Sequence, residues 1–218
     1  MRGTAGKTAA RGGRPSRNEA LRLRERILVA ATELFLVEGY GSTSIESIAK
    51  RAGVSKRTLY DRFDDKAVLF AAVVHRIIGQ IRPAADVPLV EGATLADILK
   101  RLALLILNAA LSPQAIALHR LVNAEAARFP ELVQAVARDG STREATDLIA
   151  GLLERDLAAA KLSDDNREFA AAQFIFMVVT LPQRRAMGFG TPMTPSELEA
   201  WTVRVVDLFL KGCGGLCA

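Results

Sequence analysis

Residues 43–63 read Thr43-Ser-Ile-Glu-Ser-Ile-Ala-Lys-Arg-Ala-Gly-Val-Ser-Lys-Arg-Thr-Leu-Tyr-Asp-Arg-Phe63, and this stretch decides the fold. It predicts two short amphipathic helices joined by an Ala-Gly-Val-Ser turn. In the first helix Ile45 and Ile48 share one apolar face with Ala49, and in the second Leu59 and Phe63 point inward. Two such helices form a helix-turn-helix, whose second helix enters the major groove of DNA.

The ends of both helices have their own sequence signals. We expect Thr43 to cap the first helix, with Glu46 three residues later closing a capping box. Gly53 allows the left-handed backbone that ends this helix, and Ser55 then caps the second. The turn between the helices is therefore predicted to be sharp and fixed.

The second helix leaves cations and hydroxyl groups on its outer surface, namely Lys56, Arg57, Thr58, Tyr60 and Arg62. A helical packing unit with a solvated charged face is the alternative interpretation. The charge distribution favours DNA, because residues 1–66 hold 14 Lys and Arg against 8 Asp and Glu, whereas residues 67–218 hold 15 against 16. A positive module joined to a near-neutral one indicates a localised surface for phosphates.

The run from Ile48 to Phe63, followed by Asp65-Lys66 and Leu69, resembles the tetracycline-repressor (TetR) family of transcriptional regulators. The resemblance begins near Arg22 and includes the pattern Ala30-Ala31-x-x-Leu34-Phe35-x-x-x-Gly39. Many members have glycine at the position of Arg57, so this chain carries an additional cation there. The resemblance implies DNA contacts, some of them to base edges, from Lys56, Arg57, Thr58 and Arg62. It also implies phosphate contacts from Thr43, Tyr60 and Lys66, and Ser44 and Ser55 complete the predicted DNA-binding set.

The rest of the chain is predicted to be helical, because no segment alternates with period two. We expect an all-α protein of about nine helices, three for DNA and about six beyond, as the resemblance implies. The predicted regions are a flexible basic arm (1–20), the DNA-binding domain (21–66), a helical effector-binding and dimerisation domain (67–211) and a tail (212–218). In the arm, Arg11-Gly-Gly-Arg14-Pro15 either lies in an A·T minor groove or is a solvated tail.

Helix boundaries follow from caps and prolines. Asp64, Thr94, Ser112 with Pro113, and Thr194 with Glu197 are the predicted helix starts. Pro83 to Gly92 is a predicted connection, and Pro182 is expected to kink or end its helix. The predicted helices are 23–37, 65–81, 95–111, 113–127, 130–138, 142–160, 166–187 and 195–211, besides the two of the helix-turn-helix.

A single helix-turn-helix reads only a few base pairs, so two copies are expected on one operator. The last two long helices carry the predicted dimer interface, with Phe169, Gln173, Trp201, Val205 and Leu208. The alternative is that these side chains face the core of their own chain. A two-fold four-helix interface would cover the apolar surface that remains exposed.

In the family the middle helices, residues 95–162, enclose a ligand pocket. The segment His119-Arg120-Leu121-Val122-x-x-Glu125-Ala126-x-Arg128-Phe129-Pro130-Glu131-Leu132 resembles the C-terminal domain of an AefR-like or AcrR-like subgroup. The predicted pocket residues are Asn108, His119, Asn123, Phe129, Phe176 and Met177. Taken singly, each is more simply explained as a structural residue, and Glu125 with Arg128 as an ordinary ion pair.

Other functional classes lack support in the sequence. There is no nucleophile elbow, phosphate-binding glycine loop, dinucleotide motif or metal-ligand spacing, so we expect neither an enzyme nor a cofactor. Cys213 and Cys217 form no disulfide framework. No stretch reaches the length of a membrane span, and we expect a cytoplasmic protein.

The predicted function is a homodimeric, ligand-responsive repressor that binds a palindromic operator and is released by a small molecule. The alternative is a constitutive DNA-binding regulator whose second domain only dimerises.

Overall fold

A computed structural model describes residues 17–82, 94–139, 141–156 and 162–213. These residues form ten α-helices and no strand, so the predicted all-α fold is confirmed. The helices are α1 (Arg17–Glu38), α2 (Ile45–Ala52), α3 (Lys56–Tyr60), α4 (Lys66–Ile81), α5 (Leu95–Ala110), α6 (Pro113–Glu125), α7 (Glu131–Arg138), α8 (Ser141–Asp156), α9 (Asp164–Ala186) and α10 (Pro195–Cys213).

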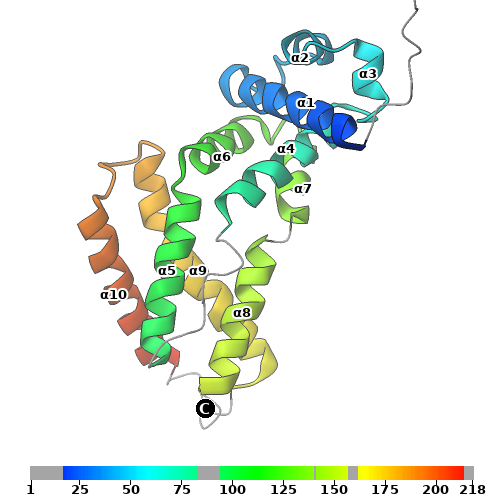
Figure 1. Cartoon of the computed structure of the whole chain (residues 1–218). Helices are drawn as coiled ribbons and strands as arrows, with labels where there is room; N and C mark the ends of the chain where they lie inside the picture. Colours follow the sequence, from blue (N-terminus) through cyan, green and yellow to red (C-terminus); the bar gives the residue numbers. More distant parts are fainter. Residues whose placement is uncertain (1–16, 83–93, 140, 157–161, 214–218) are drawn as a thin grey trace, which may run out of the picture.

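The molecule is elongated, and different helices form its two ends (Figure 1). Helices α1, α2 and α3 form one end, here called the head (residues 17–65). Helices α5 to α10 form the body, and α4 runs from the head into it. Within the body, α5, α8, α9 and α10 lie together at the end far from the head, while α6 and α7 lie next to α4 and the head.

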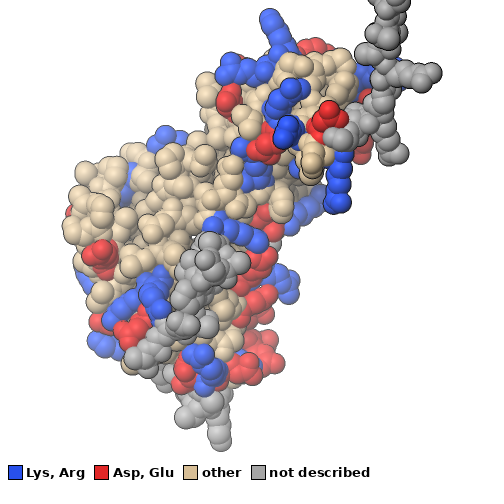
Figure 2. Space-filling view, viewed as in Figure 1, with Lys and Arg blue, Asp and Glu red and all other residues tan. Residues whose placement is uncertain are grey.

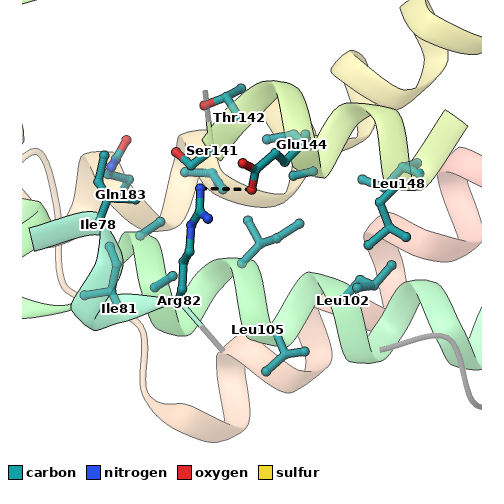
Figure 3. Close-up of a pocket in the computed structure, with 17 residues that line it drawn as sticks. Ile78, Ile81, Arg82, Leu102, Leu105, Ser141, Thr142, Glu144, Leu148 and Gln183 are labelled. Carbon is teal, nitrogen blue, oxygen red and sulfur yellow. Dashed lines mark ion pairs between the residues drawn. The ribbon is translucent and has the colours of Figure 1, made fainter. Parts of the chain in front are cut away.

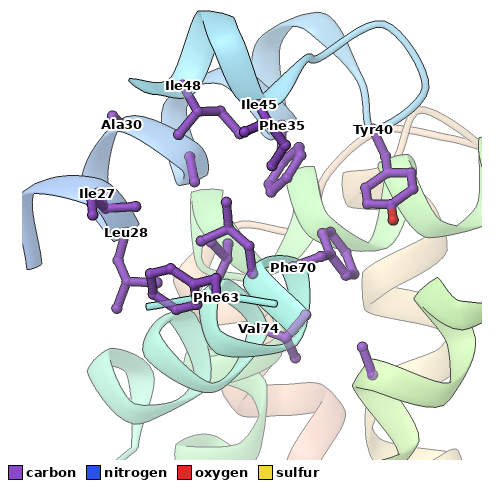
Figure 4. Packing of buried hydrophobic residues seen from close by; sticks show 14 of the residues in the cluster. Ile27, Leu28, Ala30, Phe35, Tyr40, Ile45, Ile48, Phe63, Phe70 and Val74 are labelled. Carbon is purple, nitrogen blue, oxygen red and sulfur yellow. The ribbon is translucent and has the colours of Figure 1, made fainter. Parts of the chain in front are cut away.

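Two hydrophobic clusters hold these parts together. The first joins α1 to α4 and also contains Leu118 and Leu121 of α6 and Leu132 of α7. At its centre Phe35, Tyr40 and Phe70 are packed with ring centroids 5.3 to 5.5 Å apart (Figure 4). Burial of this apolar surface stabilises the head and fixes it against α6 and α7 at the same time.

The second cluster joins α5, α8, α9 and α10. Phe174 of α9 and Phe209 of α10 have their ring centroids 4.9 Å apart within it. The two clusters do not divide the chain at residue 66, because α4, α6 and α7 pack with the head. The predicted domain boundary between residues 66 and 67 therefore does not coincide with a boundary between the two clusters, and it stays a prediction.

Several predicted helix starts are confirmed by their hydrogen bonds. The hydroxyl oxygens of Ser55, Thr94 and Ser112 each accept a bond from a backbone N–H three residues later. Thr194 and Glu197 bond reciprocally, since each backbone N–H meets the other's side chain. Local sequence therefore suffices to place these starts.

Two predicted caps are wrong by one residue. Ser44, in place of Thr43, caps α2, and Ser47 closes the capping box in place of Glu46. Thr43 is buried instead, and its hydroxyl donates to the Gly39 carbonyl over 2.7 Å. Asp65, in place of Asp64, caps α4 by accepting from the N–H of Val68 over 2.7 Å.

Some helix ends also differ from the prediction. Helix α1 begins at Arg17, so residues 17–20 of the predicted arm are helical; the rest of the arm, with Arg11 and Arg14, lies outside the described residues. Helix α6 ends at Glu125, α9 begins at Asp164 behind a Ser163 cap, and α10 extends to Cys213. The predicted connection 83–92, residues 157–160 of the predicted helix 142–160, and Cys217 also lie outside the described residues.

Pro182 does not end its helix, because α9 continues to Ala186. A proline has no N–H, so the carbonyl four residues earlier, that of Val178, lacks its helical donor. The indole Nε1 of Trp201 donates to this carbonyl over 2.9 Å. Helix α10 therefore supplies the hydrogen bond that Pro182 cannot, and α9 and α10 are joined at this point.

No single helix among the described residues is both long and apolar enough to cross a membrane. Helices α5 and α6 reach the required length and composition only when taken together across a 64° bend.

Candidate functional site

The helix-turn-helix is built as its sequence predicts. Gly53 adopts φ +65°, and its N–H bonds to the carbonyls of Ala49 and Lys50, which ends α2. Ser55 then starts α3, and Leu59 and Phe63 are fully buried beneath it. These contacts hold α3 with its opposite face turned to solvent.

The solvent-facing residues of α3 are those predicted for DNA. Lys56, Arg57 and Tyr60 are exposed, and Thr58 and Arg62 are half-buried. Figure 2 shows Lys and Arg side chains projecting from the head around α2 and α3, with a few acidic side chains among them. The structure thus brings the predicted cations onto one surface.

The two cations at the start of α3 differ in their surroundings. Lys56 forms an ion pair with Glu46 of α2, and this hydrogen bond raises the pKa of Lys56 and lowers that of Glu46. The guanidinium of the exposed Arg57 makes no hydrogen bond or ion pair with any other described residue. Sequence reasoning assigned Glu46 to a cap and so missed that it lies beside the predicted DNA surface.

The predicted serines act as caps at the same surface. The Ser55 hydroxyl accepts from the Thr58 N–H at 3.0 Å and bonds the Thr58 hydroxyl at 2.8 Å. Ser44 is exposed at the start of α2. The guanidinium of Arg62 donates to the Ala20 carbonyl over 3.4 Å, which links α1 to the end of α3.

Two predicted phosphate ligands occupy other positions. Thr43 is only 1% exposed, and its hydroxyl and N–H both bond to Gly39, so its side chain is not available to a phosphate. The ammonium of Lys66 lies 4.3 Å from the centroid of the Tyr40 ring, a cation–π contact. Partial burial lowers the pKa of Lys66. Lys66 therefore lies at the junction of head and body.

A carboxylate from the body holds the turn between α1 and α2. Oε1 of Glu125 accepts from the Tyr40 N–H at 2.8 Å, and Oε2 accepts from the Gly41 N–H at 2.7 Å. Gly39, with φ +89°, turns the chain so that the two N–H groups face α6. A Cβ at Gly39 would lie 2.6 Å from Oε1, and one at Gly41 would lie 3.0 Å from Oε2. We call this pair of bonds the Glu125 clamp.

Further contacts surround the clamp. The Tyr40 hydroxyl donates to Glu131 over 3.2 Å, and the Phe129 ring lies 5.0 Å from the Tyr40 ring, edge to face. Burial, followed by the charge of Glu131, raises the pKa of Tyr40 above its usual range. The predicted Glu125–Arg128 ion pair is not formed, because the guanidinium of Arg128 lies over the Phe129 ring instead. The glycines on both sides of Tyr40 were the only local signal for this contact.

The body contains a cavity of about 580 Å³ between α4, α5, α8 and α9 (Figure 3). Its walls are mostly aliphatic, with Ile78, Leu102, Leu105 and Leu148 among them. Its polar lining consists of Arg82, Ser141, Thr142, Glu144 and Gln183. A largely apolar cavity with a few polar groups is typical of small-molecule sites.

The predicted pocket residues do not line this cavity. Asn108 and Asn123 are exposed, and His119 is half-buried on α6. Phe129 packs against Tyr40, as described above. Phe176 is exposed, and Met177 lines a shallower depression between α9 and α10. The pocket residues expected from the sequence therefore stay a prediction, and the two on α6 lie on a helix that packs against the head.

The predicted dimer residues fall into two groups. Phe169, Gln173 and Leu208 are exposed, and the first and last of these are 55% and 64% exposed despite their apolar side chains. Val205 is buried in the second cluster, and Trp201 is half-buried and bonded to Val178. Val205 therefore faces the core of its own chain, as the alternative interpretation of the sequence stated.

Phe176 belongs with the exposed group. It lies seven residues after Phe169, so both fall on the same face of α9. Helices α9 and α10 thus leave large apolar side chains uncovered in a single chain.

Family models match both parts of the chain. Residues 27–73 match the bacterial regulatory proteins of the tetR family, and residues 97–212 match the AefR-like transcriptional repressor C-terminal domain. The activator FasR of Mycolicibacterium smegmatis is 41% identical over 71 residues, which are 33% of this chain and 31% of FasR. The regulator AcrR of Shigella flexneri is 42% identical over 60 residues, 28% of each chain. The similarity to these curated relatives thus spans about a third of their length.

Solved structures match over most of the chain. A TetR-family regulator from Mesorhizobium loti is 29% identical with a TM-score of 0.73, covering 91% of this chain and 98% of that one. The flavonoid-responsive regulator FrrA is 31% identical with a TM-score of 0.72, covering 88% of this chain and 96% of FrrA. From the helix-turn-helix, the helical body and these matches together, the chain belongs to the TetR family of transcriptional regulators, with an AefR-like C-terminal domain.

Proposed function

We propose that this regulator is a cytoplasmic repressor that binds a palindromic operator as a homodimer and leaves it when a small molecule fills the α4–α5–α8–α9 cavity. One observation carries the proposal: α4 begins at Lys66, directly after the head, and ends at Ile81 on the cavity wall. A change in cavity shape therefore acts on the helix that holds the DNA-binding head. In this proposal residues 21–66 bind DNA, and residues 67–211 bind the effector and the second subunit.

The DNA contacts are assigned by exposure and charge. Arg57 and Lys56 at the start of α3 meet base edges, Thr58 and Arg62 assist, and Tyr60 contacts phosphate. Ser44 and Ser55 lie at the helix starts, where backbone N–H groups favour phosphate. Thr43 is left out of this set because it is buried, and Lys66 acts at the junction.

Base-edge and phosphate contacts predict different variant behaviour. Arg57→Ala should weaken binding to the selected operator more than to random duplex, because the base preference is lost as well as a charge. Tyr60→Phe should weaken both by the same factor. Binding isotherms on the two duplexes at one salt concentration decide this, and equal losses for Arg57→Ala would refute its role in sequence reading.

Dimerisation is assigned to α9 and α10. The exposed Phe169, Phe176 and Leu208 are too apolar to remain in water on one surface, and a two-fold four-helix packing would bury them. Two heads are then held about one helical turn of DNA apart, which makes the operator palindromic. Leu208→Glu should give a monomer with an unchanged helical spectrum and weak, unselective DNA binding.

Ligand response is supported by the cavity and by a related structure. The related FrrA is a flavonoid-responsive regulator, and a cavity of about 580 Å³ is large enough for a molecule of that size. The alternative is a constitutive regulator whose body only dimerises. A thermal-shift screen of small amphipathic compounds, with operator release as the second readout, separates the two, because a constitutive regulator would show neither stabilisation nor release.

In this proposal two connections between head and body transmit the effect of ligand binding. One is α4, which is covalently continuous from head to cavity. The other is the Glu125 clamp, which ties the α1–α2 turn to the end of α6. A ligand alters the balance of two head orientations only by the difference in its affinity for them.

A further inference from the structure

We propose that the cavity takes an amphipathic molecule with an acidic group, and that this group binds Arg82 by displacing Glu144. The inference rests on the proposed ligand response and names the chemical class of the effector. It starts from the only charged groups among the described residues of the cavity lining, Arg82 and Glu144, which form one ion pair in an otherwise mostly apolar space.

The cavity lining is mostly apolar, and its charged groups belong to a single ion pair. Aliphatic side chains of α4, α5, α8 and α9 cover most of the wall, so the body of the ligand must be apolar. Arg82 projects from the end of α4 toward α8, where its Nη2 lies 2.9 Å from Oε2 of Glu144 (Figure 3). Ser141 and Thr142 lie beside this pair.

The two partners of this ion pair are not equally easy to displace. The side chain of Glu144 is 64% exposed, whereas that of Arg82 is 43% exposed. A displaced Glu144 carboxylate can therefore be hydrated with little movement. A guanidinium never loses its charge at physiological pH, so Arg82 keeps a positive charge at the cavity whenever Glu144 leaves. A carboxylate or acidic phenol on a ligand supplies a counter-ion for this charge, in the bidentate geometry that arginine favours.

A cationic ligand fits less well. It would have to take Glu144 from Arg82 and would then lie beside the positive charge of the guanidinium, which repels it. Because exposed ion pairs contribute little to stability, replacing the Glu144 carboxylate by an acidic group of the ligand has a low cost. The lining therefore selects for acids over amines.

The exchange has a structural consequence for the switch. Arg82 is the residue that caps the C-terminus of α4, and its N–H bonds to the Ile78 carbonyl. The Arg82–Glu144 ion pair ties the end of α4 to the first turn of α8. An acidic ligand replaces this ion pair, so that α4 is no longer bonded to α8. Arg82, at the end of the helix that carries the head, is then bonded to the ligand.

Three ten-carbon probes that differ only in the head group test the proposal: decanoate, decan-1-ol and decylammonium. Binding to the full-length protein is measured by calorimetry or by displacement of a fluorescent probe, below the aggregation concentration of each compound. We expect decanoate to bind at least tenfold more tightly than decanol, and decylammonium to bind most weakly. Tighter binding of the amine than of the acid would overturn the proposal.

Substitutions of Arg82 and Glu144 are expected to change decanoate affinity in opposite directions. Arg82→Gln should weaken decanoate binding at least tenfold while leaving decanol within threefold. Glu144→Gln should tighten decanoate binding severalfold, because the competing carboxylate is gone. Arg143→Gln is the matched control, since Arg143 is exposed on the same turn of α8 and does not line the cavity. Weaker decanoate binding by Glu144→Gln, or equal binding by wild type and Arg82→Gln, would contradict the exchange.

The outcome is separable from that of the proposed function. A wild-type protein that binds its selected operator but none of the three probes refutes the ligand class and leaves DNA binding intact. Circular dichroism establishes that each variant is folded, and the gain expected for Glu144→Gln does not arise from a folding defect.

Discussion

Replacing Glu125 with glutamine is expected to loosen the head from the body. The carboxylate accepts two backbone hydrogen bonds, from Tyr40 at 2.8 Å and from Gly41 at 2.7 Å. Glutamine keeps one acceptor oxygen, but its NH₂ group faces the other N–H, so one bond is lost and two donors oppose each other. A bond to a charged acceptor contributes about 1.5–3 kcal/mol, and because the site is partly exposed we expect a loss of about 2 kcal/mol.

This loss has two measurable effects. If head and body unfold together, about 2 kcal/mol lowers the Tm of a chain of this size by about 4–8 °C. By hydrogen exchange, the amides of Tyr40 and Gly41 should open about 30-fold more often, the factor that corresponds to that energy. Glu38→Gln is the matched control, because Glu38 is exposed at the end of α1 near the same turn.

The clamp also predicts a functional effect. With one bond lost, occupancy of the cavity should change operator affinity less in Glu125→Gln than in wild type, because one of the two connections proposed to transmit the change is weakened. Unchanged protection of the Tyr40 and Gly41 amides, with a Tm equal to that of Glu38→Gln, would refute the reasoning.

Three more predictions concern other contacts. Trp201→Phe should cost about 1–2 kcal/mol of stability by leaving a carbonyl unpaired, and Pro182→Ala in the same chain should recover most of it by restoring the N–H; strictly additive costs in urea denaturation would contradict this. Glu46→Gln should raise affinity for any duplex severalfold, because it removes a negative charge beside the proposed DNA surface and frees Lys56 from its ion pair; an unchanged isotherm would disprove it. Tyr40→Phe removes a phenol whose folded-state pKa is raised, so above pH 10 only the unfolded state ionises, and wild type should lose stability relative to the variant as the pH rises. Parallel stability profiles from about pH 9 to 11 would show that the phenol titrates equally in both states.

The helix-turn-helix was predictable because its determinants are local. Gly53 needs its left-handed backbone, Ser55 bonds three residues ahead, and Leu59 falls on the buried face by helical spacing. Thr43 and Ser44 show the limit of such reasoning, since both are hydroxyl residues at the start of α2. Packing decides between them, because the chain buries Thr43 under the turn and leaves Ser44 exposed.

The cavity and the clamp depend on contacts far apart in sequence. Tyr40 and Glu125 are 85 residues apart, and no local pattern pairs them. The pocket prediction selected residues of α5, α6 and α9 together with Phe129, but the face that a helix turns to a cavity depends on how its neighbours pack. Arg82 and Glu144 were missed for the same reason, since each is an ordinary surface charge until α4 and α8 come together.

The central claim is that two copies of this chain place their α3 helices on one operator and that an occupied cavity removes them. Analytical ultracentrifugation of the protein with an operator chosen from random duplexes tests it most directly, with and without a ligand that stabilises the protein. We predict a complex of two chains per palindromic duplex that dissociates when the ligand is added. A single chain per duplex, or a complex that the ligand leaves intact, would contradict the account.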